Sequence, residues 1–145
     1  MLAAAQARQL IAQRLTACAL TAGRVFEGRY HTVTEAELPC WLVGIEAEDI
    51  ETDGLASPAL QMHTLRVTAE GYAQSTDALE TQLDTLQLQA LQALHATATP
   101  FAVRVLGTRR RVNDGELADA RTGVLSLFLE AQFNTVEGAP EALQI

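Results

Sequence analysis

Alternation of apolar and polar residues between Val124 and Thr135 is the feature that most constrains the fold of this chain. One side of the extended segment carries Leu125, Leu127, Leu129, Ala131 and Phe133, and the other carries Ser126, Glu130, Gln132 and Asn134. Successive side chains of a β-strand point to opposite faces of a sheet, so this pattern predicts a strand with one buried face. The segment from about Leu60 to Gln74 alternates in the same way, with Leu65, Val67 and Ala69 opposite Thr64, Arg66, Thr68 and Glu70.

Two segments have helical periodicity. From about Leu2 to Leu20 a narrow apolar stripe recurs at helical spacing, and Gly23 stands where such a helix would stop. Asp77, with Glu80 three residues later, gives an N-cap and capping-box signal for a second helix that runs to about His95. Leucines cover so much of that helix that we expect it to pack against both a sheet and another element.

Shorter apolar runs add the remaining strands. Val25–Phe26, Cys40–Ile45 and Phe101–Leu106 are predicted strands, and Trp41, Val43 and Ile45 share one face. The acidic segment from Glu46 to Ser57 is predicted to be a loop or a protruding hairpin end, because Asp53-Gly54 and Ser57-Pro58 are turn signals. Gly107 to Arg121 is polar and basic, with a predicted turn at Asn113-Asp114-Gly115.

The order of these elements indicates a single α+β domain over residues 1–135, followed by an extended C-terminal tail over 136–145. We expect a mostly antiparallel or mixed β-sheet with two α-helices packed on one face. A chain of 145 residues buries roughly two thirds of its unfolded surface, so it forms a core without disulfides or metals. Cys18 and Cys40 are therefore expected to be reduced, structural thiols in a cytosolic protein.

Charge and hydropathy exclude several classes of partner. The net charge is -8 and the pI is about 4.7, so the molecule as a whole does not attract DNA or an anionic membrane. No stretch approaches the roughly 20 apolar residues that span a bilayer. Arg8 and Arg14 interrupt the apolar pattern of the first 20 residues, which argues against a signal peptide.

The residues give little sign of catalysis. Cys40 is the only candidate nucleophile, and its place at the start of a strand predicts a buried, small apolar residue instead. His63 is in phase with Leu65 and Val67, which predicts a core or boundary histidine. No histidine or cysteine has metal-ligand spacing. We therefore expect no catalytic centre, no cofactor and no metal site.

Two charged clusters are the candidate contact sites. The acidic cluster comprises Glu46, Glu48, Asp49, Glu51 and Asp53. It lacks the frame of a calcium-binding loop, so we interpret it as a solvated loop or a docking surface for a basic patch. The basic cluster comprises Arg104, Arg109, Arg110 and Arg111. A local phosphate or DNA contact is one interpretation of it, and pairing with acidic residues of this chain or a neighbouring subunit, such as Asp114, Glu116 and the 46–53 segment, is the favoured one.

One compact motif and the order of the elements resemble the tail terminator proteins of long-tailed phages, the lambda minor tail protein U type. The motif begins with Arg24-Val25-Phe26, continues through Arg29 and closes with Glu37-Leu38-Pro39. An apolar strand and an acidic turn follow it, then an alternating strand, a Leu-rich helix and a late strand in L-x-L-x-L-x-A. The likeness extends from about residue 5 to residue 135.

The resemblance implies a structural virion protein of the tail. Such a protein forms a ring, usually a hexamer, that sits on the last disc of the tail tube, stops its polymerisation and presents the surface that joins the head. The implied partners are other copies of the chain, the tail tube protein and a head–tail connector or neck protein, with DNA passing through the ring and no membrane. Assembly in the host cytoplasm is implied as well. The segments from Glu46 to Pro58 and from Arg104 to Arg121 are then the expected contact regions, and the C-terminal tail reaches over a neighbour.

Two alternatives stay open. The first keeps the ring but makes the chain a neck or head-completion protein. The second is a small oligomeric α+β ligand-binding module or enzyme, in which Cys40, His63 and the acidic loop line a pocket.

Overall fold

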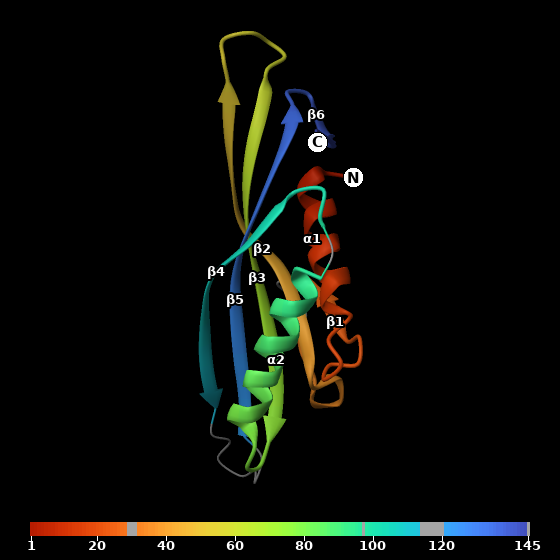
Figure 1. Ribbon diagram of the computed structural model, residues 1–145, viewed down its shortest axis with the longest axis vertical. Coiled ribbons are helices and arrows are strands. Elements are labelled where there is room, and N and C mark those ends of the chain that lie inside the picture. Colours follow the sequence, from red (N-terminus) through yellow and green to blue (C-terminus); the bar gives the residue numbers. More distant parts are fainter. Residues whose placement is uncertain (29–31, 97, 114–120, 145) are drawn as a thin grey trace.

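A curled β-sheet with helices over one face forms the protein, as the computed structural model shows for residues 1–28, 32–96, 98–113 and 121–144 (Figure 1). The elements in these ranges are α1 (Ala3–Leu15), β1 (Val25–Glu27), the 3-10 helix η1 (Glu35–Glu37), β2 (Cys40–Asp53), β3 (Leu60–Ser75), α2 (Leu79–Leu94), β4 (Ala102–Asn113), β5 (Arg121–Val136) and β6 (Ala139–Gln144). The predicted α+β class is confirmed.

The sheet is mixed, and the short strands β1 and β6 extend it at opposite ends of the long strands. The strand order is β1-β2-β3-β5-β4, and β6 pairs with the far end of β5. Only β1 runs parallel to its neighbour, β2, and the other pairs are antiparallel. β1 pairs only with residues 41–43, near the start of β2. At the other end of β2, the hairpin that it forms with β3 projects beyond the helices (Figure 1).

The core lies between the helices and the inner face of the sheet. Alternate residues of β3 and β5 are buried there, among them Leu65, Val67, Leu125, Leu127 and Leu129. α2 packs against β3, β5 and α1, as its wide apolar surface predicts. Its buried residues are Leu79, Leu83, Leu86, Ala90, Ala93 and Leu94. Each fully buried leucine contributes roughly 1.5–3 kcal/mol of transfer free energy, so the α2 interface is a large part of the core.

The first helix is shorter than predicted. α1 ends at Leu15 rather than Leu20, because the hydroxyl of Thr16 donates to the carbonyl of Gln13. The next amide groups, of Ala17 and Cys18, bond to carbonyls three residues back, as in a series of tight turns. None of the described helices is long and apolar enough to cross a membrane.

The capping box predicted at Asp77 is wrong. The N-cap of α2 is Ala78, which makes no side-chain cap bond, and its own N–H donates to the hydroxyl of Ser75 at 3.1 Å. A capping box is present elsewhere, at η1, where the N–H of Thr34 donates to Glu37 Oε1 at 3.0 Å.

The segment from Glu46 to Asp53 is a strand rather than a loop. β2 continues as far as Asp53, which lies opposite Leu60 of β3, and the turn is confined to residues 54–59. The backbone ladder with β3 holds these acidic residues extended despite their low strand propensity. The other part of the prediction, a protruding hairpin end, is confirmed (Figure 1).

Two further predictions need correction. The strand predicted over Phe101–Leu106 is β4, which continues to Asn113 and therefore includes the arginines at 109–111. Residues 114 and 115 of the predicted turn lie outside the described residues. The predicted extended tail folds back as β6 after a turn at Gly138, whose φ of 81° favours glycine. The side-chain amide of Gln6 donates to the carbonyl of Glu141 at 2.9 Å, which ties β6 to α1.

Candidate interaction surface

The sheet face that points away from the helices is the candidate interaction surface, and we call it the outer face. Directly opposed residues of neighbouring strands share a face. Thr68 of β3, Phe128 of β5 and Gly107 of β4 form one such row on the outer face, and Glu70, Ser126 and Arg109 form the next. No helix in the described part of the chain covers this side of the sheet (Figure 1).

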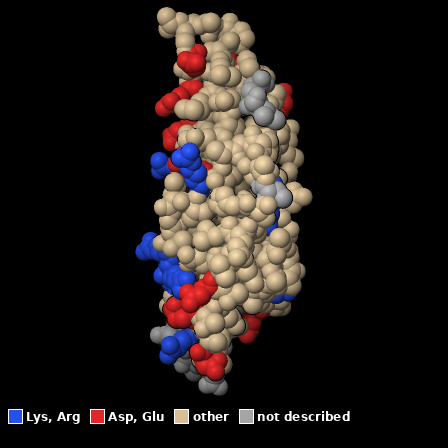
Figure 2. Space-filling view, in the orientation of Figure 1, with Lys and Arg blue, Asp and Glu red and all other residues tan. Residues whose placement is uncertain are grey.

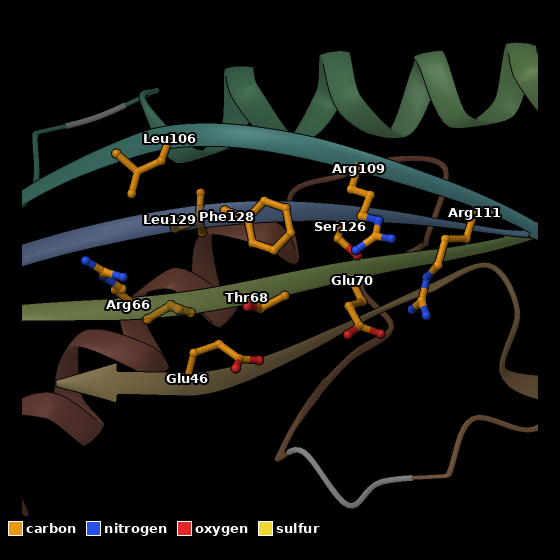
Figure 3. A pocket seen from close by; sticks show the side chains of 11 residues that line it. Glu46, Arg66, Thr68, Glu70, Leu106, Arg109, Arg111, Ser126, Phe128 and Leu129 are labelled. Carbon is orange, nitrogen blue, oxygen red and sulfur yellow. The ribbon is translucent and has the colours of Figure 1, made fainter.

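A depression of about 490 Å³ lies in the outer face, and we call it the hollow (Figure 3). Its lining comes from four strands: Glu46 of β2, Arg66, Val67, Thr68 and Glu70 of β3, Ser126, Phe128 and Leu129 of β5, and Leu106, Arg109 and Arg111 of β4. Three arginines and two glutamates make the lining net positive in a protein whose net charge is -8. Leu106 and Phe128 add apolar surface, with 57% and 39% of their areas exposed.

Two β-bulges shape the hollow. Ile45, Val67, Leu129 and Val105 form one row across four strands. Immediately after this row the register shifts in β2 between Ile45 and Ala47 and in β4 between Val105 and Gly107. Glu46 and Leu106 are therefore the extra residues of the two bulges, and both line the hollow.

Polar contacts order one side of the hollow. The hydroxyl of Tyr72 donates to Glu70 Oε2 at 2.5 Å. Burial, together with this hydrogen bond to the carboxylate, raises the pKa of Tyr72 above its ordinary value. Tyr72 therefore stays a neutral donor at physiological pH and holds Glu70 in place.

The structure divides the predicted acidic cluster between the two faces. Glu48 points to the inner side, where its Oε1 lies 2.5 Å from His63 Nδ1. Asp49, Glu51 and Asp53 share the outer face of the hairpin end with Thr64, Met62 and Leu60, their partners in β3. Figure 2 shows acidic side chains along one edge of this end, with basic side chains further down the same edge.

His63 is the core histidine that the sequence predicts. It is 4% exposed, its Nε2 lies 2.6 Å from Thr135 Oγ1, and its ring stacks on Phe133 with 4.8 Å between the centroids. Both ring nitrogens and one face of the ring are thus satisfied within the fold.

The basic cluster is divided as well. Arg109 and Arg111 line the hollow, and Arg104 lies on the outer face opposite Glu130. Arg110 points to the helix side, where its guanidinium binds α2 at Asp84 Oδ1 (2.8 Å), Glu80 Oε2 (3.1 Å) and Gln87 Oε1 (3.0 Å). Pairing within the chain is thus confirmed for Arg110, although with other acidic residues than those expected; Asp114 and Glu116 lie outside the described residues.

Sequence reasoning missed several residues of the hollow. The alternation of β3 puts Arg66 and Glu70 on its polar side, but nothing in the sequence marks them as part of a site. Phe128 offered a signal, because it is an aromatic residue in the polar phase of β5. Leu106 carried no such signal, since nothing in its apolar run indicates a bulge.

The alternative pocket of Cys40 and His63 is not formed. Cys40 lies opposite Tyr72 on β3, nine residues from His63, which corresponds to about 30 Å along the strand. The two residues also belong to opposite faces of the sheet. Burial, and then the nearby Glu37 carboxylate, raise the pKa of the buried Cys40 thiol to about 11, which favours the unreactive thiol form.

The described residues contain no group of three or more histidine, cysteine or acidic side chains arranged to hold a metal ion. The fold and the outer face define a two-layer α+β protein with a broad, charged sheet surface.

Comparisons with known proteins add one similarity. No family model matches the sequence, and no curated protein matches it. The chain is similar to a chain in the solved structure titled "Virion of native gene transfer agent (GTA) particle", with 20% sequence identity and a TM-score of 0.43. The match covers 94% of this chain and 98% of that chain.

Proposed function

We propose that the protein is a structural component of a virion, and more specifically a tail terminator. In this role it forms a homo-oligomeric ring, with six subunits as in the family it resembles, that caps the tail tube, stops its polymerisation and provides the head-joining surface. Its location is the tail of the virion, after assembly in the host cytoplasm. Its partners are other copies of itself, the tube protein and a connector or neck protein.

The outer face is the observation that carries the proposal. A ring built from identical subunits needs two different, complementary patches on each subunit. The outer face has an acidic hairpin end with Asp49, Glu51 and Asp53 and a hollow that is net positive. These patches lie at separate levels of an elongated molecule, as a head-to-tail contact requires, because the hollow includes Thr68 and the hairpin end lies eight residues away along β3 at Leu60 (Figure 1).

The two described ends of the motif behind the resemblance lie close together, which supports the proposal. β1, at one end, runs parallel to the start of β2, directly after the other end, with Val25 opposite Trp41. The guanidinium of Arg24 donates to the carbonyl of Pro39 at 2.9 Å, and the N–H of Trp41 donates to the carbonyl of Arg24 at 2.9 Å. Residues far apart in the motif are thus held together by the backbone and by one arginine.

The proposed role is non-catalytic, without cofactor or metal. The high pKa of Cys40 is the opposite of what an activated nucleophile needs. A net charge of -8 also suits a ring through which DNA passes, because a negative subunit does not bind the phosphate backbone over its whole surface.

Light scattering after size exclusion, with and without tail tubes assembled from the tube protein of the same particle, tests this proposal. We expect a species about six times the 15.6 kDa subunit mass, either in solution or on the ends of tubes. Tubes polymerised in its presence should be capped and shorter than tubes grown alone, as measured by negative-stain microscopy. A compact dimer that leaves tube growth unchanged contradicts the proposal, and a ring that binds only the connector identifies a neck protein instead.

A further inference from the structure

The tip of the β2–β3 hairpin carries an unusual apolar residue. Leu55 is fully exposed in the turn over residues 54–59, at the end of two long strands. Glu51 and Asp53 lie on the outer face just below it, so the tip is an apolar knob with an acidic collar. An apolar side chain presented in this way, within a rim of charge, is typical of an anchor for a protein contact.

The hollow offers the complementary chemistry. Its exposed apolar residues, Leu106 and Phe128, provide a surface on which a leucine can be desolvated. Arg66, Arg109 and Arg111 lie around them and supply the positive charge that an acidic collar would meet (Figure 3). Arginine is suited to this role because its planar guanidinium binds carboxylates with two hydrogen bonds.

The tip does not reach the hollow of its own chain. Thr68, in the hollow, lies eight residues along β3 from Leu60, which corresponds to about 26 Å at the usual rise of a strand. β3 is hydrogen-bonded to β2 on one side and to β5 on the other, so the hairpin cannot fold back over this distance. The partner that the two patches fit is therefore a second copy of the chain.

We propose that the tip of one subunit, with Leu55 as its anchor, docks into the hollow of the next subunit. The inference rests on the proposed ring and deepens it by assigning the contact that joins neighbouring subunits. The contact is heterologous, since knob and hollow are different surfaces, and repeated copies of such a contact close into a ring if the rotation permits. Its ionic part weakens with salt, because the screening length falls from about 10 Å at 0.1 M to about 3 Å at 1 M.

Disulfide trapping tests this contact even where the docked state is short-lived. One full-length protein carries Leu55→Cys and the other, with a different tag, carries Leu106→Cys. The control partner carries Leu88→Cys on α2, because Leu88 is as exposed as Leu106, at 58% and 57%, but belongs to the helix side. The native thiols, Cys18 and Cys40, are buried and do not compete.

We expect the 55–106 heterodisulfide to form roughly tenfold faster than the 55–88 heterodisulfide, because docking raises the effective concentration of the two thiols. Arg109→Glu with Arg111→Glu in the hollow partner should remove this advantage. Glu51→Lys with Asp53→Lys in the tip partner should restore it, which a general loss of folding would not do. Circular dichroism confirms that each variant keeps its fold.

The outcomes separate this inference from the proposed function. Equal rates for the 55–106 and 55–88 pairs overturn the docking inference, and rings that still cap tubes then leave the terminator proposal intact. A fast, charge-dependent 55–106 reaction supports the contact. If that protein neither forms rings nor binds tubes, the contact stands and the terminator proposal fails.

Discussion

Substitution of Gly71 should destabilise the protein because this position has no space for a side chain. A Cβ atom at Gly71 would lie 2.9 Å from Trp41 Cζ3, 3.0 Å from Trp41 Cη2 and 3.3 Å from Leu86 Cδ1. Favourable carbon–carbon contacts lie at about 3.5–4.0 Å, so the methyl group of alanine overlaps the indole ring. Trp41 and Leu86 are both fully buried, so the overlap falls within the packed core.

We expect Gly71→Ala to lower the free energy of unfolding by about 1–3 kcal/mol, the usual cost of overpacking a core. Alanine also restricts the unfolded chain, which offsets about 0.4–1 kcal/mol. Gly107→Ala is the matched control, because it is also in a strand but a Cβ there meets nothing within 4 Å. The difference between the two variants therefore isolates the overlap with Trp41.

Urea unfolding followed by fluorescence measures this difference, since Trp41 is the only tryptophan in the chain. The midpoint should fall for Gly71→Ala at an unchanged slope. In a Trp41→Phe background, followed by circular dichroism, the same substitution should cost less, because the shorter ring leaves room for the methyl group. Equal midpoints for Gly71→Ala and Gly107→Ala, or an unchanged cost in the Trp41→Phe background, would refute this account of the packing.

Three further predictions concern groups that the fold buries or pairs. Raising the pH from about 9 to about 11 should lower the free energy of unfolding, because the unfolded Cys40 thiol ionises at 9.0 and the folded one at about 11; Cys40→Ala should reduce this slope in urea titrations. His63→Phe and Thr135→Val should each cost roughly 1–3 kcal/mol in urea unfolding, because each leaves a buried polar partner unpaired, and the double variant should cost less than the sum. Arg110→Ala should lower the free energy of unfolding by less than about 1 kcal/mol, since its acidic partners on α2 are largely exposed. It should also leave the mass measured by light scattering unchanged, because Arg110 does not face the hollow.

Periodicity predicted the elements whose burial is one-sided. β3 was expected over Leu60 to Gln74 and spans Leu60–Ser75, because every second residue faces the helices. The end of α1 and the start of α2 were predicted wrongly, because each is set by a local competition among hydroxyl groups. At the end of α1, the hydroxyl of Thr16 bonds to the carbonyl of Gln13. At the start of α2, the hydroxyl of Ser75 accepts from the N–H of Ala78. Neither bond follows from the apolar pattern.

The charged segments were placed wrongly in part, for a different reason. The turn signals at Asp53-Gly54 and Ser57-Pro58 predict a loop or a protruding hairpin end from Glu46 to Ser57, but pairing with β3 outweighs the poor strand propensity of aspartate and glutamate and extends β2 to Asp53. The candidate site was identified in part, since Glu46, Arg109 and Arg111 were all singled out beforehand. Their meeting in one hollow depends on the strand order β2-β3-β5-β4, which a single sequence does not reveal.

The two bulges let each strand carry one extra residue without turning its charges to the other side of the sheet. In β2, Val43 and Ile45 face the helices, and because Glu46 is the extra residue beside Ala47, Asp49 and Glu51 stay on the outer face. In β4, Leu106 is the extra residue after Val105, so Arg109 and Arg111 stay on the outer face as well. If the same residues were paired without a bulge, the alternation would carry these charges to the helix side. A relative that lacked Glu46 or Leu106 would therefore pair regularly and keep the same faces, so these are the two positions at which a change of one residue in length would preserve the surface during divergence.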